Sequence, residues 1–356
     1  MLKNMLSLAL LVAVIVPTAY ARDQINVVGS STVYPFAIVV AEKFGKTTEF
    51  KTPKIESTGS GGGLKLFCAG VGEKHPDFTN SSRAITEKEI KKCRNNGVKD
   101  ITEIKVGYDG IVIANSKSSK AFKMTRMDLY LALAAEIPNP NGSKSFVKNQ
   151  HKTWKDVNPE LPEIKIEVLG PPPTSGTRDA FVELAMEKGG CEKIKWIKAL
   201  KKKNKQEYKA KCHTIREDGL YIEAGENDNL MVQKLISNSK ALAIFGFSFL
   251  EQNADKVHGA IINGVEPSFE NISSGKYPVS RPLFFYAKNA HLEAIPGMKE
   301  YVEMFLSDAA SGSDGYLTEK GLIPMPKEER AEINPKVINF TLIVGDKSPS
   351  KIKKKQ

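Results

Sequence analysis

The chain has 356 residues, of which 41% are hydrophobic and 26% are charged. These values exclude disorder as the main state, because the apolar content is sufficient for a core, and the length suits two domains of about 100–200 residues each. The formal net charge of +11 leaves four kinds of partner open, namely nucleic acid, a membrane surface, a small anion or no specific partner.

Residues 1–21 have the pattern of a secretion signal. Lys3 precedes an apolar segment from Met5 to Val16, and Ala19-Tyr20-Ala21 places small residues where a signal peptidase reads them. The apolar segment is shorter than the about 20 residues that a membrane-spanning helix needs, which argues against an anchor. We therefore expect a mature protein that begins near Arg22 and is exported.

Three strand–helix units follow the signal. The predicted strands are residues 25–28, 54–57 and 78–82, and each runs into a turn rich in Ser or Gly. Helical spacing of apolar residues predicts helices over 36–44 and 64–71 after the first two turns. After the third turn, a segment of acidic and basic residues indicates a helix over 86–95. This alternation predicts an α/β fold with parallel strands, in which ligands bind beyond the carboxyl ends of the strands.

The remaining elements are less regular. Apolar runs predict strands over residues 106–115, 164–169, 241–249 and 282–287, the last as a return to the first domain. The strand over 164–169 leads into Ser175-Gly176-Thr177-Arg178 and a helix over 180–187. Ile194, Ile197 and Leu200 predict an amphipathic helix with a lysine face. Later helical segments are 300–305 and 328–332.

Four cysteines, at 68, 93, 191 and 212, allow three disulfide pairings in an oxidising compartment. We favour the pairing of neighbours, Cys68 with Cys93 and Cys191 with Cys212, in which each bond closes a loop of about 20 residues. The alternative is a metal site. No C-x-x-C pair occurs and no His lies at ligand spacing from a Cys, so we expect neither a metal nor a cofactor.

The positive charge is concentrated in two segments. Nine Lys and two Glu between Cys191 and Cys212 give +7, and the five Lys of residues 347–356 give +5. With Lys3 also removed, the rest of the chain carries −2. The lysine helix is either a solvated surface or a patch that docks on a membrane or a partner. No basic motif is interleaved with aromatic residues, so we do not expect a nucleic-acid partner.

The four Ser/Thr/Gly-rich turns can each cap a helix, which is the simpler interpretation. Their number, and the arginines Arg83 and Arg178 beside two of them, favour a shared anion site built from backbone N–H groups, hydroxyls and guanidinium groups. Gly45-Lys46-Thr47 is not a nucleotide-binding loop, because Val40 stands where the first glycine is required. The sequence contains neither G-x-S-x-G nor H-E-x-x-H, so we expect no enzyme activity.

The motifs Gly29-Ser30-Ser31-Thr32-Val33-Tyr34-Pro35, Ser57-Thr58-Gly59-Ser60-Gly61-Gly62-Gly63, Ser81-Ser82-Arg83 and Ser175-Gly176-Thr177-Arg178 occur in one order along the chain. In this set and over nearly all of the mature chain, the sequence resembles the periplasmic phosphate-binding proteins of the phosphate ABC importer. The resemblance implies a two-lobed, type II periplasmic-binding-protein fold with a two-strand hinge. It implies lobe I from 22–107 plus 276–346, lobe II from 108–275, and a basic tail at 347–356.

The resemblance also implies inorganic phosphate as ligand, a membrane permease as partner, and a monomer. Carried over by motif, the phosphate-binding residues are Ser31, Thr32, Ser60, Gly61, Ser82 and Arg83 from lobe I and Ser175, Gly176, Thr177 and Arg178 from lobe II. The alternatives are another tetrahedral oxyanion, a secreted phosphatase-type enzyme, or a surface interaction protein that uses the lysine patch.

One departure from the family concerns selectivity. Some members have an Arg and an Asp before Ser-Gly-Thr and an Asp at the position of Ser82, whereas this chain has Pro171, Pro173 and a serine. A carboxylate that accepts the proton of phosphate rejects sulfate, which has no proton to donate. We expect Asp109, at the crossing between the lobes, to take this role, and Asp179 to interact with the dipole of its helix.

Overall fold

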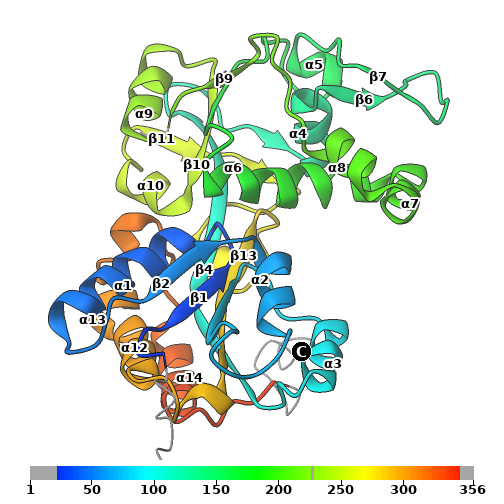
Figure 1. The fold of residues 1–356 in the computed structure, drawn as a ribbon. Coiled ribbons are helices and arrows are strands. Elements are labelled where there is room, and N and C mark those ends of the chain that lie inside the picture. Colours follow the sequence, from blue (N-terminus) through cyan, green and yellow to red (C-terminus); the bar gives the residue numbers. More distant parts are fainter. Residues whose placement is uncertain (1–21, 226–227, 345–356) are drawn as a thin grey trace, which may run out of the picture.

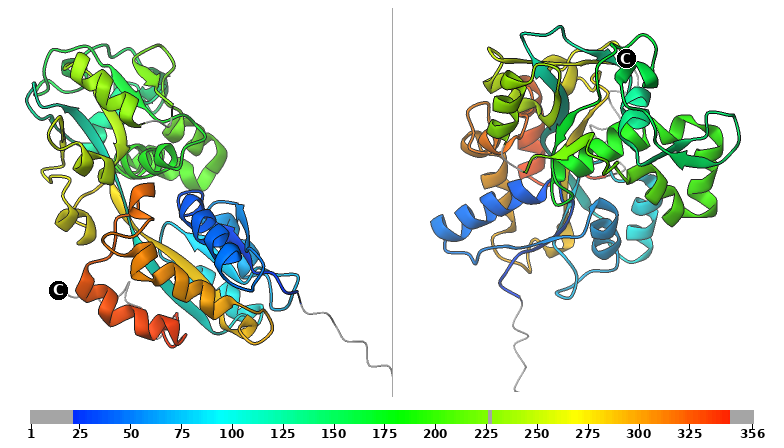
Figure 2. Two further views of the ribbon diagram at one scale, coloured as in Figure 1. Left: turned by 90° about the vertical axis from the view of Figure 1, so that its left-hand side faces the viewer. Right: turned by 90° about the horizontal axis from the view of Figure 1, so that it is seen from above.

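The computed structural model describes residues 22–225 and 228–344, so the predicted signal (1–21) and basic tail (347–356) lie outside the described residues. The chain forms an upper and a lower body that are joined by the long strand β4 (Ile101–Ser116) and by β13 (Ser280–Lys288) (Figure 1). The two bodies stack along these strands, as the side view also shows (left panel of Figure 2).

The lower body contains the first three strand–helix units and the last part of the chain. Its strands are β1 (Asn26–Gly29), β2 (Lys54–Ser57), β3 (Phe78–Ser81), β13 and the first half of β4. Its helices are α1 (Tyr34–Thr47), α2 (Ser60–Phe67), α3 (Glu87–Asn95), η3 (Asn289–His291), α12 (Met298–Leu306), α13 (Asp308–Ser311), η4 (Thr318–Lys320) and α14 (Lys327–Ile338).

The upper body contains the middle of the chain. Its strands are β5 (Lys123–Met124), β6 (Glu136–Pro138), β7 (Phe146–Lys148), β8 (Val168–Gly170), β9 (Tyr221–Glu223), β10 (Leu242–Gly246), β11 (Val257–Gly259) and β12 (Ile261–Ile262). Its helices are α4 (Arg126–Leu133), α5 (Trp154–Val157), α6 (Gly176–Phe181), η1 (Val182–Glu187), η2 (Cys191–Lys193), α7 (Lys195–Lys203), α8 (Lys205–His213), α9 (Asp228–Ser237), α10 (Phe247–Gln252) and α11 (Phe269–Ser273).

One sheet runs through both bodies in the order β2-β1-β3-β13-β4-β10-β8-β9, and β11 also pairs with β4. The strands β1, β2 and β3 are parallel, as predicted, whereas β13 and β4 are antiparallel to their neighbours. Residues 101–110 of β4 pair with β13, and residues 111–114 pair with β10. The strand β4 therefore changes its partner strand between Gly110 and Ile111. The mixture of helices with this sheet confirms the predicted α/β class.

The burial of β13 explains why its sequence is apolar without alternation. Leu283 and Phe285 pack into one core of the lower body, while Phe284 and Tyr286 pack into a second core beneath α2 and α3. Because side chains alternate between the two faces of a strand, a strand that is covered on both faces reads as a continuous apolar run. A third and larger core, which includes Trp154 and Phe245, fills the upper body.

Disulfides join Cys68 to Cys93 and Cys191 to Cys212, so the predicted pairing of neighbours is confirmed. The first bond ties α2 to α3, and the second joins η2 to α8. No helix within residues 22–225 or 228–344 combines the length and the apolar character needed to cross a membrane.

Two predicted strands differ from the structure. The apolar run over 241–249 is not one strand, because β10 ends at Gly246 and Phe247 begins the helix α10. Phe247 and Leu250 are buried at helical spacing, so the aromatic residues after Gly246 belong to a helix that covers the sheet. The strand predicted over 164–169 is shorter and begins later than expected, because β8 spans only Val168–Gly170.

Candidate functional site

The turn after β1 brings two predicted site residues to the carboxyl edge of the sheet. Gly29 has a φ of +136°, and a Cβ there would collide with the backbone of Asn80 on β3, so glycine permits the close approach of the two strands. Ser30 Oγ then accepts a hydrogen bond from Val33 N at 3.4 Å, just before α1. In this turn Thr32 is buried, while Ser31 is half-buried.

The turns after β2 and β3 meet at the same edge. Ser82 N donates to Ser60 Oγ at 3.1 Å, and the two hydroxyl oxygens lie 3.2 Å apart. Gly61 lies beside Arg83, whose Nη2 would be 4.0 Å from a Cβ at the glycine. The structure therefore brings Ser60, Gly61, Ser82 and Arg83 together.

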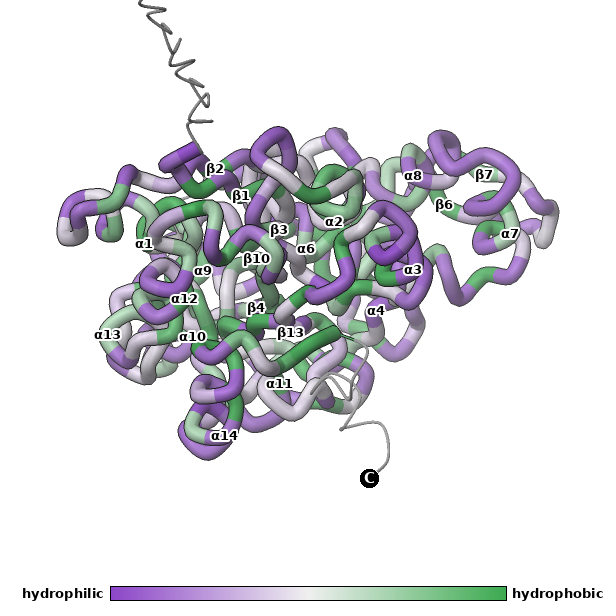
Figure 3. Tube along the Cα trace, turned by 60° about the horizontal axis from the view of Figure 1, so that its bottom comes forward, coloured by the Kyte–Doolittle hydropathy of each residue, from purple (hydrophilic) through white to green (hydrophobic). Residues whose placement is uncertain are grey.

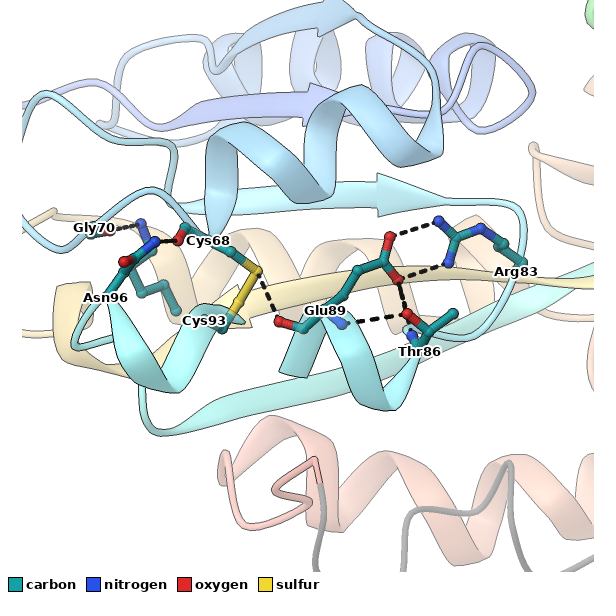
Figure 4. Close-up of a disulfide and its surroundings, with 8 residues drawn as sticks. Cys68, Gly70, Arg83, Thr86, Glu89, Cys93 and Asn96 are labelled. Atoms are coloured by element: carbon teal, nitrogen blue, oxygen red, sulfur yellow. Dashed lines mark hydrogen bonds and ion pairs between the residues drawn. A yellow bond between two sulfur atoms is a disulfide. The ribbon is translucent and has the colours of Figure 1, made fainter. Parts of the chain in front are cut away.

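Arg83 is held by an acid of its own body (Figure 4). Its Nη1 and Nη2 donate to the two carboxylate oxygens of Glu89 at 2.9 and 2.7 Å, and Glu89 also accepts from Thr86 in the capping box of α3. Burial raises the pKa of Glu89, but the hydrogen bonds from Arg83 and Thr86 outweigh it and the net pKa is lowered. Glu89 is therefore ionised and balances the charge of Arg83.

The fourth turn lies in the upper body and faces the first. Ser175 caps α6 by accepting from Thr177 N at 3.2 Å. A Cβ on Gly176 would lie 3.4 Å from Thr32 Cα, and Ser31 Oγ donates to Asp179 Oδ2 at 2.9 Å. Asp179 is in the first turn of α6, as predicted, and it also forms this contact between the two bodies.

Arg178 has its partners within the upper body. Its Nη1 donates to the carbonyl oxygen of Pro171 at 3.0 Å and lies 3.5 Å from Glu223 Oε1. Its guanidinium carbon lies 4.8 Å from the centre of the Tyr221 ring. These contacts hold the side chain against β8 and β9 in the upper body.

The buried cation of the site is Arg281, which was not among the predicted site residues. Its side chain is only 6% exposed. Its Nη2 donates to Thr32 Oγ1 at 2.7 Å, its Nε to Asp109 Oδ2 at 3.2 Å, and its Nη1 to Glu183 Oε2 at 2.7 Å. One guanidinium thus joins the turn before α1, the strand β4 and the helix η1. The signal in the sequence was a single arginine directly before the predicted strand at 282–287.

The two acids beside Arg281 differ in their ionisation. Burial raises the pKa of Asp109, and Arg281 offsets only part of this effect, so the net pKa remains raised. Burial also raises the pKa of Glu183, but Arg281 and Lys188 outweigh it and the net pKa is lowered. Glu183 is therefore ionised beside Arg281, and Asp109 is the more readily protonated of the two carboxyl groups.

The described part of the chain brings together no three His, Cys, Asp or Glu side chains that could hold a metal ion. What the site offers is hydroxyl groups, glycine backbone, one buried guanidinium and three carboxylates. This set suits hydrogen bonding to an oxygen-rich ligand.

Comparison with known proteins agrees with the fold. The model of the PBP superfamily domain matches residues 16–309. The phosphate-binding protein PstS of Staphylococcus epidermidis is 32% identical over 308 residues, which cover 84% of this chain and 78% of that protein. The PstS of Staphylococcus saprophyticus is 29% identical over 315 residues, or 87% and 82% of the two chains.

Among solved structures, a possible phosphate binding protein from Planctomyces limnophilus has a TM-score of 0.70 at 28% identity, with 89% of this chain and 98% of that chain covered. This likeness confirms the predicted two-lobed binding-protein fold. The matched family model and the similarity to PstS together place the chain in the PBP superfamily and, within it, in the family of the PstS binding proteins.

Proposed function

We propose that this protein captures inorganic phosphate between its two bodies and delivers it to the membrane permease of an ABC importer. The observation that carries the proposal is the contact between the turns at Ser31–Thr32 and Gly176–Asp179, directly beside the buried Arg281. A ligand held between these turns would contact both bodies at once. The names of the PstS relatives support phosphate as that ligand.

The proposed lobes are the lower body, residues 22–107 plus 276–346, and the upper body, residues 108–275. The proposed phosphate ligands are those that the sequence indicated, with Asp179 and Arg281 added: Ser31, Thr32, Ser60, Gly61, Ser82, Arg83, Asp109, Ser175, Gly176, Thr177, Arg178, Asp179 and Arg281. Arg83 and Arg178 would have to exchange part of their contacts with Glu89 and Glu223 for contacts with the anion. Arg281 already donates to the Thr32 hydroxyl.

Two carboxylates are candidates for the acceptor of the phosphate proton. Asp109, the acceptor predicted from the sequence, accepts a hydrogen bond from Arg281, and Arg281 in turn donates to Thr32. Arg281 thus links Asp109 to Thr32. Asp179 is in direct contact with Ser31 and therefore lies at the proposed phosphate position itself. We propose Asp179 as the acceptor, and the matched variants Asp179→Asn and Asp109→Asn distinguish the two. The variant that narrows the ratio of phosphate to sulfate affinity identifies the acceptor.

Titration calorimetry of the mature chain with phosphate, sulfate, molybdate and a phosphonate tests the function. We expect tight binding of phosphate and weak binding of sulfate, because sulfate cannot donate to a carboxylate acceptor. Absence of binding to all four anions would contradict the proposal. Preference for molybdate or sulfate would assign the site to another tetrahedral oxyanion.

We also propose that the ligand is bound without chemical change by an exported, monomeric protein. The predicted signal at residues 1–21 supports export, and the absence of nucleophile and metal motifs from the sequence supports binding alone. Incubation with a chromogenic phosphate ester separates binding from hydrolysis. Release of the chromophore above the level of a heat-denatured sample would favour the phosphatase alternative.

A further inference from the structure

The segment from Cys191 to His213 forms a helical hairpin that the phosphate site does not use. We call this segment the lysine hairpin. The Cys191–Cys212 disulfide closes it, and α7 and α8 lie at the outer end of the upper body (Figure 1). The hydropathy colouring shows mainly polar chain at this projecting end, next to β6 and β7 (Figure 3).

The apolar side of the lysine hairpin is already covered. Ile197, Tyr208 and Cys212 are buried in the upper core. Ile194, Trp196 and Leu200 pack against the same core and are half-buried. The hairpin therefore keeps no wide apolar stripe that could enter a lipid bilayer or cover a partner helix.

Its lysines, in contrast, point to solvent. Two of the nine are neutralised, Lys201 by Glu187 and Glu192, and Lys211 by Glu136. Within residues 22–225 and 228–344, no carboxylate lies within ion-pair distance of the other seven, and all seven are exposed: Lys193, Lys195, Lys198, Lys202, Lys203, Lys205 and Lys209. Lys144 and Lys148, from the neighbouring β6–β7 hairpin, are exposed as well.

We propose that the lysine hairpin binds the surface of an anionic phospholipid membrane. Lys195, Lys198 and Lys202 follow at intervals of three and four residues on α7, so they lie on one face of the helix. The hairpin has nine lysines and no arginine. Arginine is enriched at protein interfaces because it pairs with carboxylates in a fixed geometry, whereas lysine is depleted there.

A row of flexible point charges without a fixed acceptor fits a diffuse negative surface. Attraction of this kind is electrostatic, contributes about fivefold in affinity for each lysine near the lipid, and weakens as salt shortens the Debye length. The exported protein would be held beside the membrane while its phosphate site, in another part of the molecule, stays open to solvent. An acidic protein partner is the competing possibility, and the experiment includes it as an outcome.

Flotation of the full mature chain with lipid vesicles tests the proposal. We expect binding to vesicles of phosphatidylcholine that contain phosphatidylglycerol, no binding to pure phosphatidylcholine, and loss of binding at high salt. The triple variant Lys195→Gln/Lys198→Gln/Lys202→Gln should bind about a hundredfold more weakly. The matched control Lys88→Gln/Lys91→Gln/Lys92→Gln removes the same charge from exposed positions of α3 and should bind as the wild type does.

Three outcomes would overturn the proposal. The first is a wild-type chain that does not bind the anionic vesicles at low salt. That result would favour an acidic protein as the partner of the lysine hairpin. The second is equal binding by the triple variant and the control. The third is loss of binding only when the lysines of residues 347–356 are changed to glutamine, since the tail would then be the membrane contact. Phosphate titration of the triple variant, expected to match the wild type, shows that the variant is folded and keeps this test separate from that of the proposed function.

Discussion

Positive charge serves two opposite purposes in the site at Arg281 and in the lysine hairpin. Arg281 is 6% exposed, and its hydrogen bonds reach the turn before α1, the strand β4 and the helix η1. Seven lysines of the hairpin are exposed and face solvent. A buried charge must be paired to be tolerated, so it fixes its neighbours in place. An exposed charge costs little and acts at a distance, so it influences the approach of other molecules and contributes little to the fold.

Removal of the buried cation should have the largest effect. Arg281→Met leaves the carboxyl groups of Asp109 and Glu183 without their shared partner, and we expect the free energy of unfolding to fall by about 3–5 kcal/mol. Urea denaturation measures this loss. In the control Arg178→Met the partner Glu223 is 51% exposed, so the expected loss is below about 1 kcal/mol. Equal losses in the two variants would contradict the comparison, while Asp109→Asn should restore part of the stability of Arg281→Met.

Removal of the hairpin disulfide should have the next largest effect. Cys191→Ser/Cys212→Ser frees a loop whose ends are 21 residues apart, which should lower the free energy of unfolding by about 3 kcal/mol. The matched variant Cys68→Ser/Cys93→Ser frees a loop of 25 residues and should lose about the same amount. Denaturant titration without reductant compares them. A negligible loss for the hairpin pair alone would show that its helices are fixed by packing.

Glu187 connects the lysine hairpin to the upper body and should make its stability depend on pH. Burial raises the pKa of Glu187, but hydrogen bonds from His213 and Lys201 lower it to about 2, against 4.5 for the free group. Its stabilising effect is therefore complete above pH 4.5 and is lost as the pH falls through about 2.

The variant Glu187→Gln should lose about 2 kcal/mol at neutral pH, which is less than the full pKa shift because Lys201 is exposed to solvent. Between pH 4.5 and about 2, unfolding measurements should show a smaller decline for this variant than for the wild type. Parallel curves for the two proteins would show that Glu187 does not contribute to the acid sensitivity.

The contact between the two bodies through Ser31 should have a smaller effect. Ser31→Ala removes a solvent-exposed hydrogen bond to Asp179 and a proposed ligand of phosphate. We expect the binding free energy of phosphate to weaken by about 1 kcal/mol. Calorimetry of Ser31→Ala, Asp179→Ala and the double variant gives the coupling energy of the pair. Strict additivity of the two single changes would show that this contact plays no part in binding.

The exposed lysines should affect stability least. The triple variant Lys195→Gln/Lys198→Gln/Lys202→Gln should unfold within about 0.5 kcal/mol of the wild type, because surface substitutions away from paired groups are nearly neutral. A marked gain in stability at low salt would reveal mutual repulsion among these lysines. A marked loss of stability would show that these lysines make contacts that stabilise the fold.

Local patterns predicted much of this structure. The first three strand–helix units depend on apolar periodicity and on turn residues within short windows, and the structure has all three. The two disulfides join cysteines that are neighbours along the chain, so proximity alone favoured the correct pairing. The turns at Ser31 and Gly176 were identified because each combines a strand end with hydroxyl and glycine residues.

What the sequence could not reveal depends on distant pairing. Arg281 meets Asp109, which lies 172 positions earlier in the chain, only because β13 pairs with β4. Arg83 and Arg178 were predicted from their positions beside the turns, but their ion pairs with Glu89 and Glu223 depend on side-chain packing that the sequence pattern does not show. At Gly246 the apolar run continues while the structure changes from strand to helix, and only the packing of α10 on the sheet determines that change.

The register of β4 and β13 places Asp109 opposite Arg281, next to the point where β4 exchanges one neighbouring strand for another. The strands that connect the two bodies and the buried cation of the proposed binding site therefore involve the same few residues. Under the proposed function, an anion that contacts Arg281 would act directly on this connection, with no other side chain between the ligand and the strands that join the bodies.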